Sequence, residues 1–291
     1  MRSEACLNAA MLSGEEIRRG RAGPPACPEA AAARQEPPVK RRLAVLVPVL
    51  LACLALAPEA PRAQPAPAGK GPCKAVESEG QPYTVCTVDL TRERVRLFWL
   101  GPDGLPYASL SSLAQKQGPR LSFAMNAGMY DKGQAPVGLY VEEGREMKGV
   151  STANGPGNFH LKPNGVFYVK GDRAGVLDTV RYLRAKPAPD FATQSGPMLV
   201  IEGKIHPKIS EDGPSQKIRN GVGVRDGGRT AVFAISEQPV TFGAFARLFK
   251  DGLGCRNALF LDGSVSSLYA PGLGRSDLSR PLGPLVGAVG R

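Results

Sequence analysis

The segment from Leu259 to Leu268, with the sequence LFLDGSVSSL, constrains the fold more than any other part of the chain. Its apolar residues run directly into Asp262-Gly263, which is typical of a buried strand that ends at a tight turn. A carboxylate among hydroxyl groups suits acid–base or sugar chemistry, whereas a strand followed by an Asx turn is the simpler alternative. The hydroxyl groups come from Ser264, Ser266 and Ser267.

Three further segments repeat this pattern of an apolar run beside polar residues. They are LSFAMNAGMYD at 121–131, QSGPMLV at 194–200 and KIRNGVGV at 217–224. Taken in order with LFLDGSVSSL, these motifs resemble those of the phosphodiester glycosidase family. The match is closer to the bacterial periplasmic branch of that family.

The resemblance extends from Lys74 to Val289. It implies an exported hydrolase that cleaves a sugar from a sugar-1-phosphodiester, with a phosphodiester-linked carbohydrate as its partner. Ala127 and Ser264 stand where the family often has glycine, which leaves the substrate open. The alternative is a non-catalytic module that binds anionic glycans or envelope polymers through the same polar residues.

Many short strands joined by glycine turns, with few helices, predict an α+β fold: a single domain around a largely antiparallel or mixed sheet with flanking helices. Segment 94–100 is expected to be the hairpin partner of 83–90, and 222–224 that of 230–235. The other expected strands are 121–125, 137–142, 165–169, 199–201 and 258–261, and the expected helices are 109–117 and the one that Thr241 caps. Neither a GxGxxG motif after a strand nor a Walker loop occurs, which argues against a nucleotide-binding fold.

The N-terminal quarter of the chain differs in composition from the rest. Residues 1–39 are rich in Ala, Pro, Arg and Glu, and we expect them to be disordered or to precede the true start. Residues 40–63 combine a basic stretch with a short apolar run, which predicts a secretory signal peptide. An uncleaved anchor is the alternative. Residues 64–72 are a Pro/Ala linker, and residues 73–291 are the expected phosphodiester glycosidase-like domain.

Cysteine positions agree with export to the bacterial periplasm or the extracellular space. Cys73 and Cys86 flank a turn and are expected to form a disulfide, whereas Cys255 is expected to be a buried thiol. Cys53 ends a segment that resembles a lipoprotein box. Lipidation there, or an uncleaved signal, would attach the domain to a membrane, but the apolar run continues past Cys53 and favours plain export.

The chain is basic, with 37 Lys and Arg against 26 Asp and Glu and a net charge of +11. The basic residues are scattered, aromatic residues are sparse and no nucleic-acid motif occurs, so we expect no nucleic-acid partner. A basic surface favours an anionic substrate such as a phosphodiester.

Glycoside cleavage commonly uses two carboxyl groups, one as acid and the other as base or nucleophile. Asp262 is the first candidate, and Asp131 or Glu237 is expected to assist it. For Asp131, which is followed by Lys132-Gly133, a simple turn role is slightly favoured.

Arg219 is predicted to bind the phosphate through two parallel hydrogen bonds, and an arginine that merely covers the sheet edge is the alternative. Further polar residues and glycines are expected to contact the substrate. They are Asn126, Gly128, Gln194, Ser195, Asn220, Gly263, Ser264, Ser266 and Ser267.

No cofactor or metal is expected from the sequence. The two histidines, His160 and His206, lack ligand spacing to another His or Cys. A hard cation such as calcium, held by Asp262, Asn and carbonyl oxygens, remains an open alternative.

Overall fold

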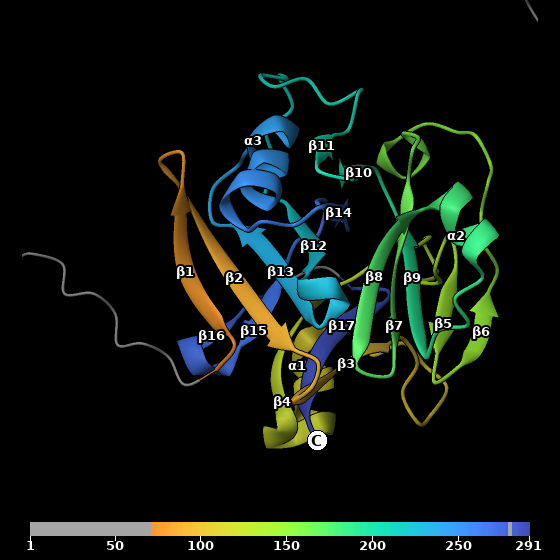
Figure 1. Cartoon of the computed structure of the whole chain (residues 1–291). Coiled ribbons are helices and arrows are strands. Elements are labelled where there is room, and N and C mark those ends of the chain that lie inside the picture. The colour runs from red at the N-terminus through yellow and green to blue at the C-terminus, as the bar shows by residue number, and fades with distance from the viewer. Residues whose placement is uncertain (1–70, 279–280) are drawn as a thin grey trace, which may run out of the picture. The chain divides into compact units, whose positions relative to one another are not determined.

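The computed structural model describes residues 71–278 and 281–291, which belong to one compact unit (Figure 1). The predictions for residues 1–39 and 40–63, for Cys53 and for most of the linker at 64–72 lie outside the described residues. Within the described part, no helix has the length and apolar character needed to cross a membrane.

Three antiparallel sheets organise the described residues, which confirms the predicted α+β fold. The seven-stranded sheet has the order β1 (Cys73–Ser78), β2 (Gln81–Asp89), β13 (Thr230–Ser236), β12 (Asn220–Arg225), β14 (Asn257–Phe260), β10 (Met198–Ile201) and β11 (Lys204–Ile205). One five-stranded sheet has the order β16 (Arg275–Ser276), β15 (Leu268–Ala270), β4 (Leu121–Asn126), β17 (Leu285–Gly290) and β3 (Glu93–Phe98). The other has the order β6 (Arg145–Lys148), β5 (Tyr140–Glu142), β9 (Phe191–Ser195), β7 (Gly165–Lys170) and β8 (Arg173–Asp178).

In the described part of the chain, each of the three α-helices begins at a side chain that caps its N-terminus. Thr241 caps α3 (Phe242–Arg247), as the sequence predicts. The helix predicted at 109–117 is α1 (Leu110–Gln117), which Ser109 caps. The chain continues from α3 through a π-helical turn, Leu248–Gly252. The third helix, α2 (Thr179–Ala185), is capped by Asp178 and was not predicted from the sequence.

The predicted pairing of segment 94–100 with 83–90 is wrong. Strand β2 pairs with β1 and β13, whereas β3 pairs with β17 in another sheet. The reason is local: Glu79 and Gly80 both adopt positive φ, 51° and 70°, and form the tight turn that joins β1 to β2. Because β1 and β13 occupy both edges of β2, β3 has no free edge there to pair with. The same hairpin aligns Cys73 with Cys86, and the predicted disulfide is formed.

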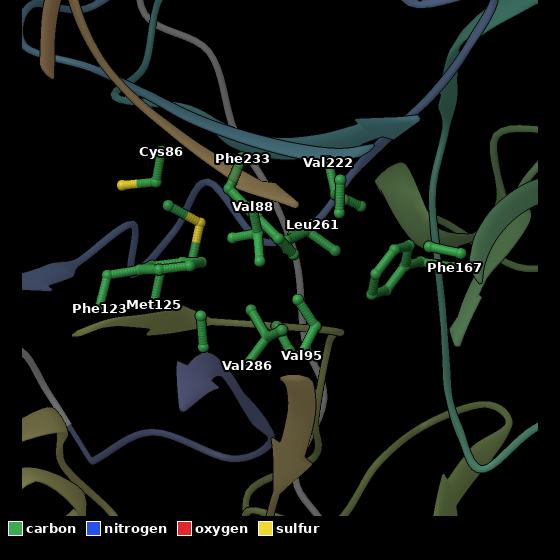
Figure 2. Packing of buried hydrophobic residues seen from close by; sticks show 14 of the residues in the cluster. Cys86, Val88, Val95, Phe123, Met125, Phe167, Val222, Phe233, Leu261 and Val286 are labelled. Carbon is green, nitrogen blue, oxygen red and sulfur yellow. The ribbon is translucent and has the colours of Figure 1, made fainter. Parts of the chain in front are cut away.

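The largest core cluster draws on all three sheets (Figure 2). The centre of the Phe233 ring on β13 lies 5.1 Å from the ring centre of Phe123 on β4. It lies 5.7 Å from the ring centre of Phe167 on β7. Fully burying such a side chain contributes roughly 1.5–3 kcal/mol. This shared core fixes the strands of different sheets against one another, and therefore fixes the positions of their ends.

Candidate active site

Four strand ends from the three sheets meet at Asp262. Strand β4 ends at Asn126, β9 ends at Ser195, β12 begins at Asn220, and Asp262 follows β14 after one intervening residue. Ser195 Oγ donates to the carbonyl oxygen of Leu261 at 2.6 Å, and Asn126 Nδ2 donates to that of Asp262 at 2.9 Å. The structure therefore brings together one residue from each of the four sequence motifs.

The Asp262 side chain is half-buried at this junction. Its Oδ1 accepts a hydrogen bond from the Ser264 main-chain N–H at 3.0 Å. Burial raises the pKa of the Asp262 carboxyl above its ordinary value, and hydrogen bonds from Ser264 offset part of this rise. Among the residues that the structure describes, Asp262 forms no ion pair. It is a partly desolvated carboxylate whose hydrogen-bond partners are neutral.

The glycines beside the site allow close packing. A Cβ atom at Gly263 would lie 2.8 Å from the Phe260 ring, and one at Gly128 would lie 2.4 Å from Thr193 Oγ1. Both separations are shorter than van der Waals contact, so a larger residue would move the turn after β14 or the segment after β4. These glycines let the strand ends approach each other.

The serines after Asp262 occupy different positions. Ser264 is exposed beside the carboxylate, whereas Ser267 is buried and its main-chain N–H donates to Asn126 Oδ1 at 2.9 Å. Ser266 is half-buried, with its hydroxyl 3.2 Å from the carbonyl oxygen of Asp262. Of the three serines, Ser264 is the most accessible to a ligand.

Gln194 precedes Ser195 but its side chain takes part in a different network. Its Oε1 accepts from the main-chain N–H groups of Leu139 and Ser151, at 3.0 and 2.9 Å, and its Nε2 donates to the Ser151 carbonyl oxygen at 2.7 Å. Nε2 also lies 3.2 Å from the Thr179 hydroxyl. The Gln194 amide therefore fastens the loop at Ser151 and makes no hydrogen bond with the residues around Asp262 in the described chain.

Arg219 is 1% exposed, and its guanidinium stacks 3.6 Å from the centre of the Phe242 ring. Nε donates to the Val240 carbonyl oxygen at 2.8 Å and Nη2 to that of Ser215 at 2.7 Å. Burial lowers the pKa of Arg219 to about 10. No Asp or Glu within the described residues pairs with it, so its charge is uncompensated by the protein.

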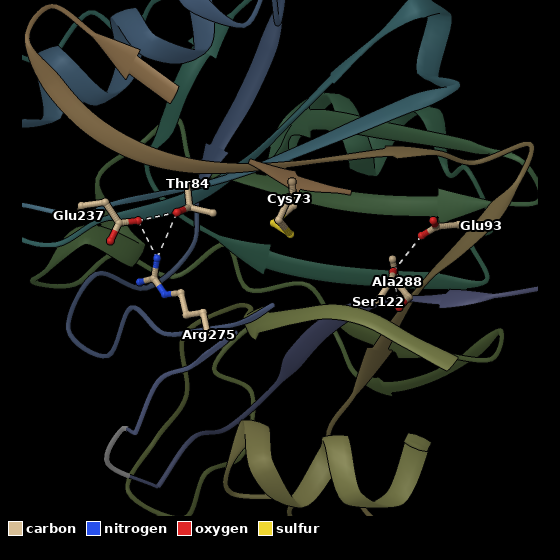
Figure 3. Close-up of a disulfide and its surroundings, with 8 residues drawn as sticks. Cys73, Thr84, Glu93, Ser122, Glu237, Arg275 and Ala288 are labelled. Atoms are coloured by element: carbon tan, nitrogen blue, oxygen red, sulfur yellow. Dashed lines mark hydrogen bonds and ion pairs between the residues drawn. A yellow bond between two sulfur atoms is a disulfide. The ribbon is translucent and has the colours of Figure 1, made fainter. Parts of the chain in front are cut away.

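The two other candidate carboxylates have partners of their own. Asp131 is exposed, and its Oδ1 accepts from the N–H groups of Gly133 and Ala135 at 2.8 and 3.1 Å, as a turn residue does. Glu237 accepts hydrogen bonds from Thr84 Oγ1 and from Arg275, each at 2.6 Å (Figure 3). Neither carboxylate makes a hydrogen bond, in the described structure, with the residues that surround Asp262.

The sequence did not predict which side chains Arg219 and Glu237 contact, because those partners lie far away along the chain. Phe242 lies 23 positions after Arg219 in the chain, and Arg275 lies 38 positions after Glu237. No local pattern joins these residues. The Asp178 cap in front of α2 was a usable signal for that helix, because Asp is a strong N-cap residue.

Metal and thiol chemistry find little support in the described part of the chain. No group of three or more His, Cys, Asp or Glu side chains there is placed to hold a metal ion. Cys255 is buried and free, and burial raises the pKa of its thiol to about 12. A thiol of that pKa is protonated at neutral pH and a poor nucleophile.

Comparisons with known proteins identify a family and a relative of this chain. The phosphodiester glycosidase family model matches residues 119–284. The "Uncharacterized protein YigE" of Escherichia coli (strain K12) is 41% identical over 189 residues, which cover 64% of this chain and 73% of that protein.

Two solved structures share the fold. The catalytic domain of zebrafish N-acetylglucosamine-1-phosphodiester alpha-N-acetylglucosaminidase, auto-inhibited by its pro-peptide, superposes with a TM-score of 0.54 at 15% identity and covers 75% of this chain and 82% of its own. A hypothetical protein from Synechocystis superposes with a TM-score of 0.50 at 17% identity, covering 75% of this chain and 61% of its own.

Proposed function

The chain belongs to the phosphodiester glycosidase family, and we propose that it hydrolyses the bond between a sugar and the phosphate of a sugar-1-phosphodiester. The observation that carries the proposal is the Asp262 carboxylate, which is partly desolvated and lies where four strand ends from three sheets meet. Groups with a raised pKa at such a junction are typical of acid–base sites.

Asp262 acts as the general base in this proposal. Water attacks the anomeric carbon and gives its proton to the Asp262 carboxylate. The carbon–oxygen bond to the phosphate breaks, and its electron pair leaves on the phosphate oxygen. The products are a free sugar and a phosphomonoester. A carboxylate with a raised pKa accepts a proton more readily, which suits this role.

One carboxylate is sufficient because the leaving group is a phosphate. The second carboxyl group of an ordinary glycosidase protonates a departing alcohol oxygen. A phosphomonoester has a second pKa of about 6, so it departs as an anion without that proton. This chemistry agrees with the structure, in which Asp131 accepts hydrogen bonds within a turn and Glu237 pairs with Arg275.

Arg219 supplies positive charge for the phosphate in this proposal. Nε and Nη2 already donate to main-chain carbonyl oxygens, so the third nitrogen, Nη1, and the uncompensated charge are what remain for an anion. Ser264, exposed beside Asp262, offers a hydroxyl to the sugar. The excess of Lys and Arg over Asp and Glu favours approach of an anionic substrate.

We place this activity outside the cytoplasm, in the periplasm or extracellular space. The Cys73–Cys86 disulfide supports this placement, because disulfides persist in oxidising compartments. The signal peptide predicted at residues 40–63 supports it as well.

The decisive test follows turnover in water enriched with ¹⁸O. Purified protein is incubated with a panel of sugar-1-phosphodiesters, and the released sugar and phosphate are analysed by mass spectrometry. Release of a phosphomonoester without ¹⁸O is expected of a glycosidase, because water then attacks the anomeric carbon and the original oxygen stays on phosphorus. Incorporation of ¹⁸O into the phosphate would show a phosphodiesterase instead. Saturable binding without turnover would favour the alternative of a glycan-binding module. A site with one carboxylate is compatible with that alternative.

A further inference from the structure

A pair of asparagine side chains joins two sheets beside Asp262. Asn126 is the last residue of β4 and Asn220 is the first of β12, and they are 1% and 0% exposed. Asn220 Nδ2 donates to the side-chain oxygen of Asn126 at 3.0 Å and to its main-chain oxygen at 2.8 Å. The amide pair therefore ties the seven-stranded sheet to the sheet that contains β4.

Each asparagine also holds one polar group of the Asp262 main chain. Asn220 Oδ1 accepts from the Asp262 N–H at 3.2 Å, and Asn126 Nδ2 donates to the Asp262 carbonyl oxygen at 2.9 Å. The Ser266 hydroxyl lies 3.2 Å from both Asn220 Oδ1 and the Asp262 carbonyl oxygen. The residue that carries the carboxylate is thus held at both of its main-chain groups by two amides that also hold each other.

These contacts leave the amides little capacity for a ligand. A side-chain amide offers two N–H donors and an oxygen with two lone pairs. Both donors of Asn220 go to Asn126, and its oxygen faces the Asp262 N–H and the Ser266 hydroxyl. The oxygen of Asn126 already accepts from Asn220 and from the Ser267 N–H.

We propose that Asn126 and Asn220 are positioning residues, which set the place of the Asp262 carboxylate relative to the reacting carbon and do not bind the sugar. The inference rests on the proposed function in so far as Asp262 acts on a substrate. The hold on the Asp262 main chain is independent of that function.

The replacement Asn220→Asp tests the pair with almost no change in shape. An aspartate there keeps an oxygen facing the Asp262 N–H, but it loses the donors to Asn126 and places a negative charge close to Asp262. Like charges at short range raise carboxyl pKa values. We expect the Asp262 titration, followed by ¹³C NMR of labelled carboxyl groups and assigned with Asp262→Asn, to move up by about one pH unit.

The kinetic expectation separates positioning from substrate binding. A misplacement of about 1 Å at a reacting group costs on the order of 100-fold in rate. In Asn220→Asp we therefore expect kcat to fall by about that factor while KM stays within about twofold, because no contact with the substrate is removed. Asn126→Asp removes the donor to the Asp262 carbonyl oxygen and is expected to act in the same direction.

Two milder variants keep the test decisive should the aspartate variants fail to fold. Ser266→Ala removes one hydroxyl from the network and is expected to lower kcat about fivefold, with KM unchanged. Ser122→Ala is the matched control on the same strand as Asn126. Its hydroxyl donates to Glu93 and to the Ala288 carbonyl oxygen (Figure 3). Ser122 lies four residues before Asn126 on β4, and the loss of its hydroxyl is expected to leave kcat unchanged.

A raised KM with unchanged kcat and an unshifted Asp262 titration would overturn the inference, because those results describe a substrate-binding pair. The NMR titration needs no substrate. If the wild-type protein hydrolyses no sugar-1-phosphodiester, the proposed function fails, and the titration of Asn220→Asp still reports whether residue 220 influences the Asp262 carboxyl.

Discussion

Asp262 and Glu237 are both acidic residues that follow strands of the seven-stranded sheet, yet their surroundings differ in kind. Glu237 follows β13 and pairs with Arg275 (Figure 3). Arg275 in turn pairs with Asp277 at 2.9 Å. Asp262 follows β14 after one intervening residue, and its partners are amides, a hydroxyl group and a main-chain N–H.

The difference teaches what each carboxylate contributes. A partly buried carboxylate that pairs with a guanidinium links two segments of the fold. A desolvated carboxylate among neutral groups binds its proton more tightly, which costs stability once it ionises but makes it a better base. The Glu237 cluster is therefore assigned to stability and Asp262 to chemistry.

The largest expected effect is that of Asp262→Asn. The amide retains an oxygen to accept from the Ser264 N–H but cannot accept the proton of the attacking water. Loss of a general base costs roughly 10²–10⁴-fold, and we expect kcat to fall on the order of 10³-fold in a sugar-release assay. Retention of full activity would refute the role assigned to Asp262.

The same variant has a pH-dependent effect on stability. The folded-state pKa of Asp262 is raised above its ordinary value of 3.8, so the folded protein binds this proton more tightly than the unfolded chain does. The stability that this proton contributes is complete below the unfolded pKa and is lost as pH rises through the folded pKa. The replacement amide does not ionise, so urea melts are expected to show Asp262→Asn gaining stability relative to wild type as the pH rises above the ordinary carboxyl pKa of 3.8. A constant difference would contradict the raised pKa.

Removal of the disulfide is expected to affect stability strongly and chemistry little. Cys73 and Cys86 are 13 positions apart, and a crosslink of that span contributes about 3 kcal/mol. The Cys73→Ala/Cys86→Ala protein is expected to unfold at lower urea with kcat preserved. Cys255→Ala, which removes a buried thiol without a crosslink, is the matched control. A large drop in kcat for the folded double variant would link the β1–β2 hairpin to the active site.

Glu237→Gln tests the other half of the comparison. It keeps an acceptor for Thr84 and loses the ion pair with Arg275, whose side chain is 21% exposed against 34% for Glu237. Partial exposure screens the pair, so we expect a loss of about 1 kcal/mol and a Tm lower by about 2–4 °C. Sugar release is expected to stay within about twofold of wild type. A rate loss similar to that of Asp262→Asn would make Glu237 the second catalytic carboxylate.

Asp131→Asn is expected to have the smallest effect. The amide oxygen can still accept from the N–H groups of Gly133 and Ala135, so both stability and kcat should remain close to wild type. Thermal melts and the sugar-release assay check this directly. A rate loss of about tenfold or more would show that Asp131 reaches the substrate.

Local patterns predicted where strands end and which ends are polar. The apolar run before Asp262, the Thr241 cap and the turn between β12 and β13 are encoded within a few neighbouring residues, and the structure confirms them. Partner choice is encoded elsewhere: β3 was assigned to the wrong sheet because the edges of β2 are occupied by strands that no local pattern around 94–100 reveals.

The sequence also did not show which way the side chains of the site point. Gln194 and Ser195 are adjacent in one motif, and their side chains point to opposite sides of β9, toward the loop at Ser151 and toward Leu261. Polar character marked both as candidates. Only the packing of three sheets separates the one beside Asp262 from the one that fastens a loop.

The pH dependence of kcat/KM tests the central claim most directly, namely that Asp262 is the one reacting carboxylate. We expect activity to fall on the acid side as Asp262 takes up its proton, at a pH above the ordinary value of 3.8. On the alkaline side activity should hold until Arg219, whose pKa is about 10, loses its charge. A bell-shaped profile that declines near neutral pH would reveal a second carboxyl group acting as an acid, and would contradict this account.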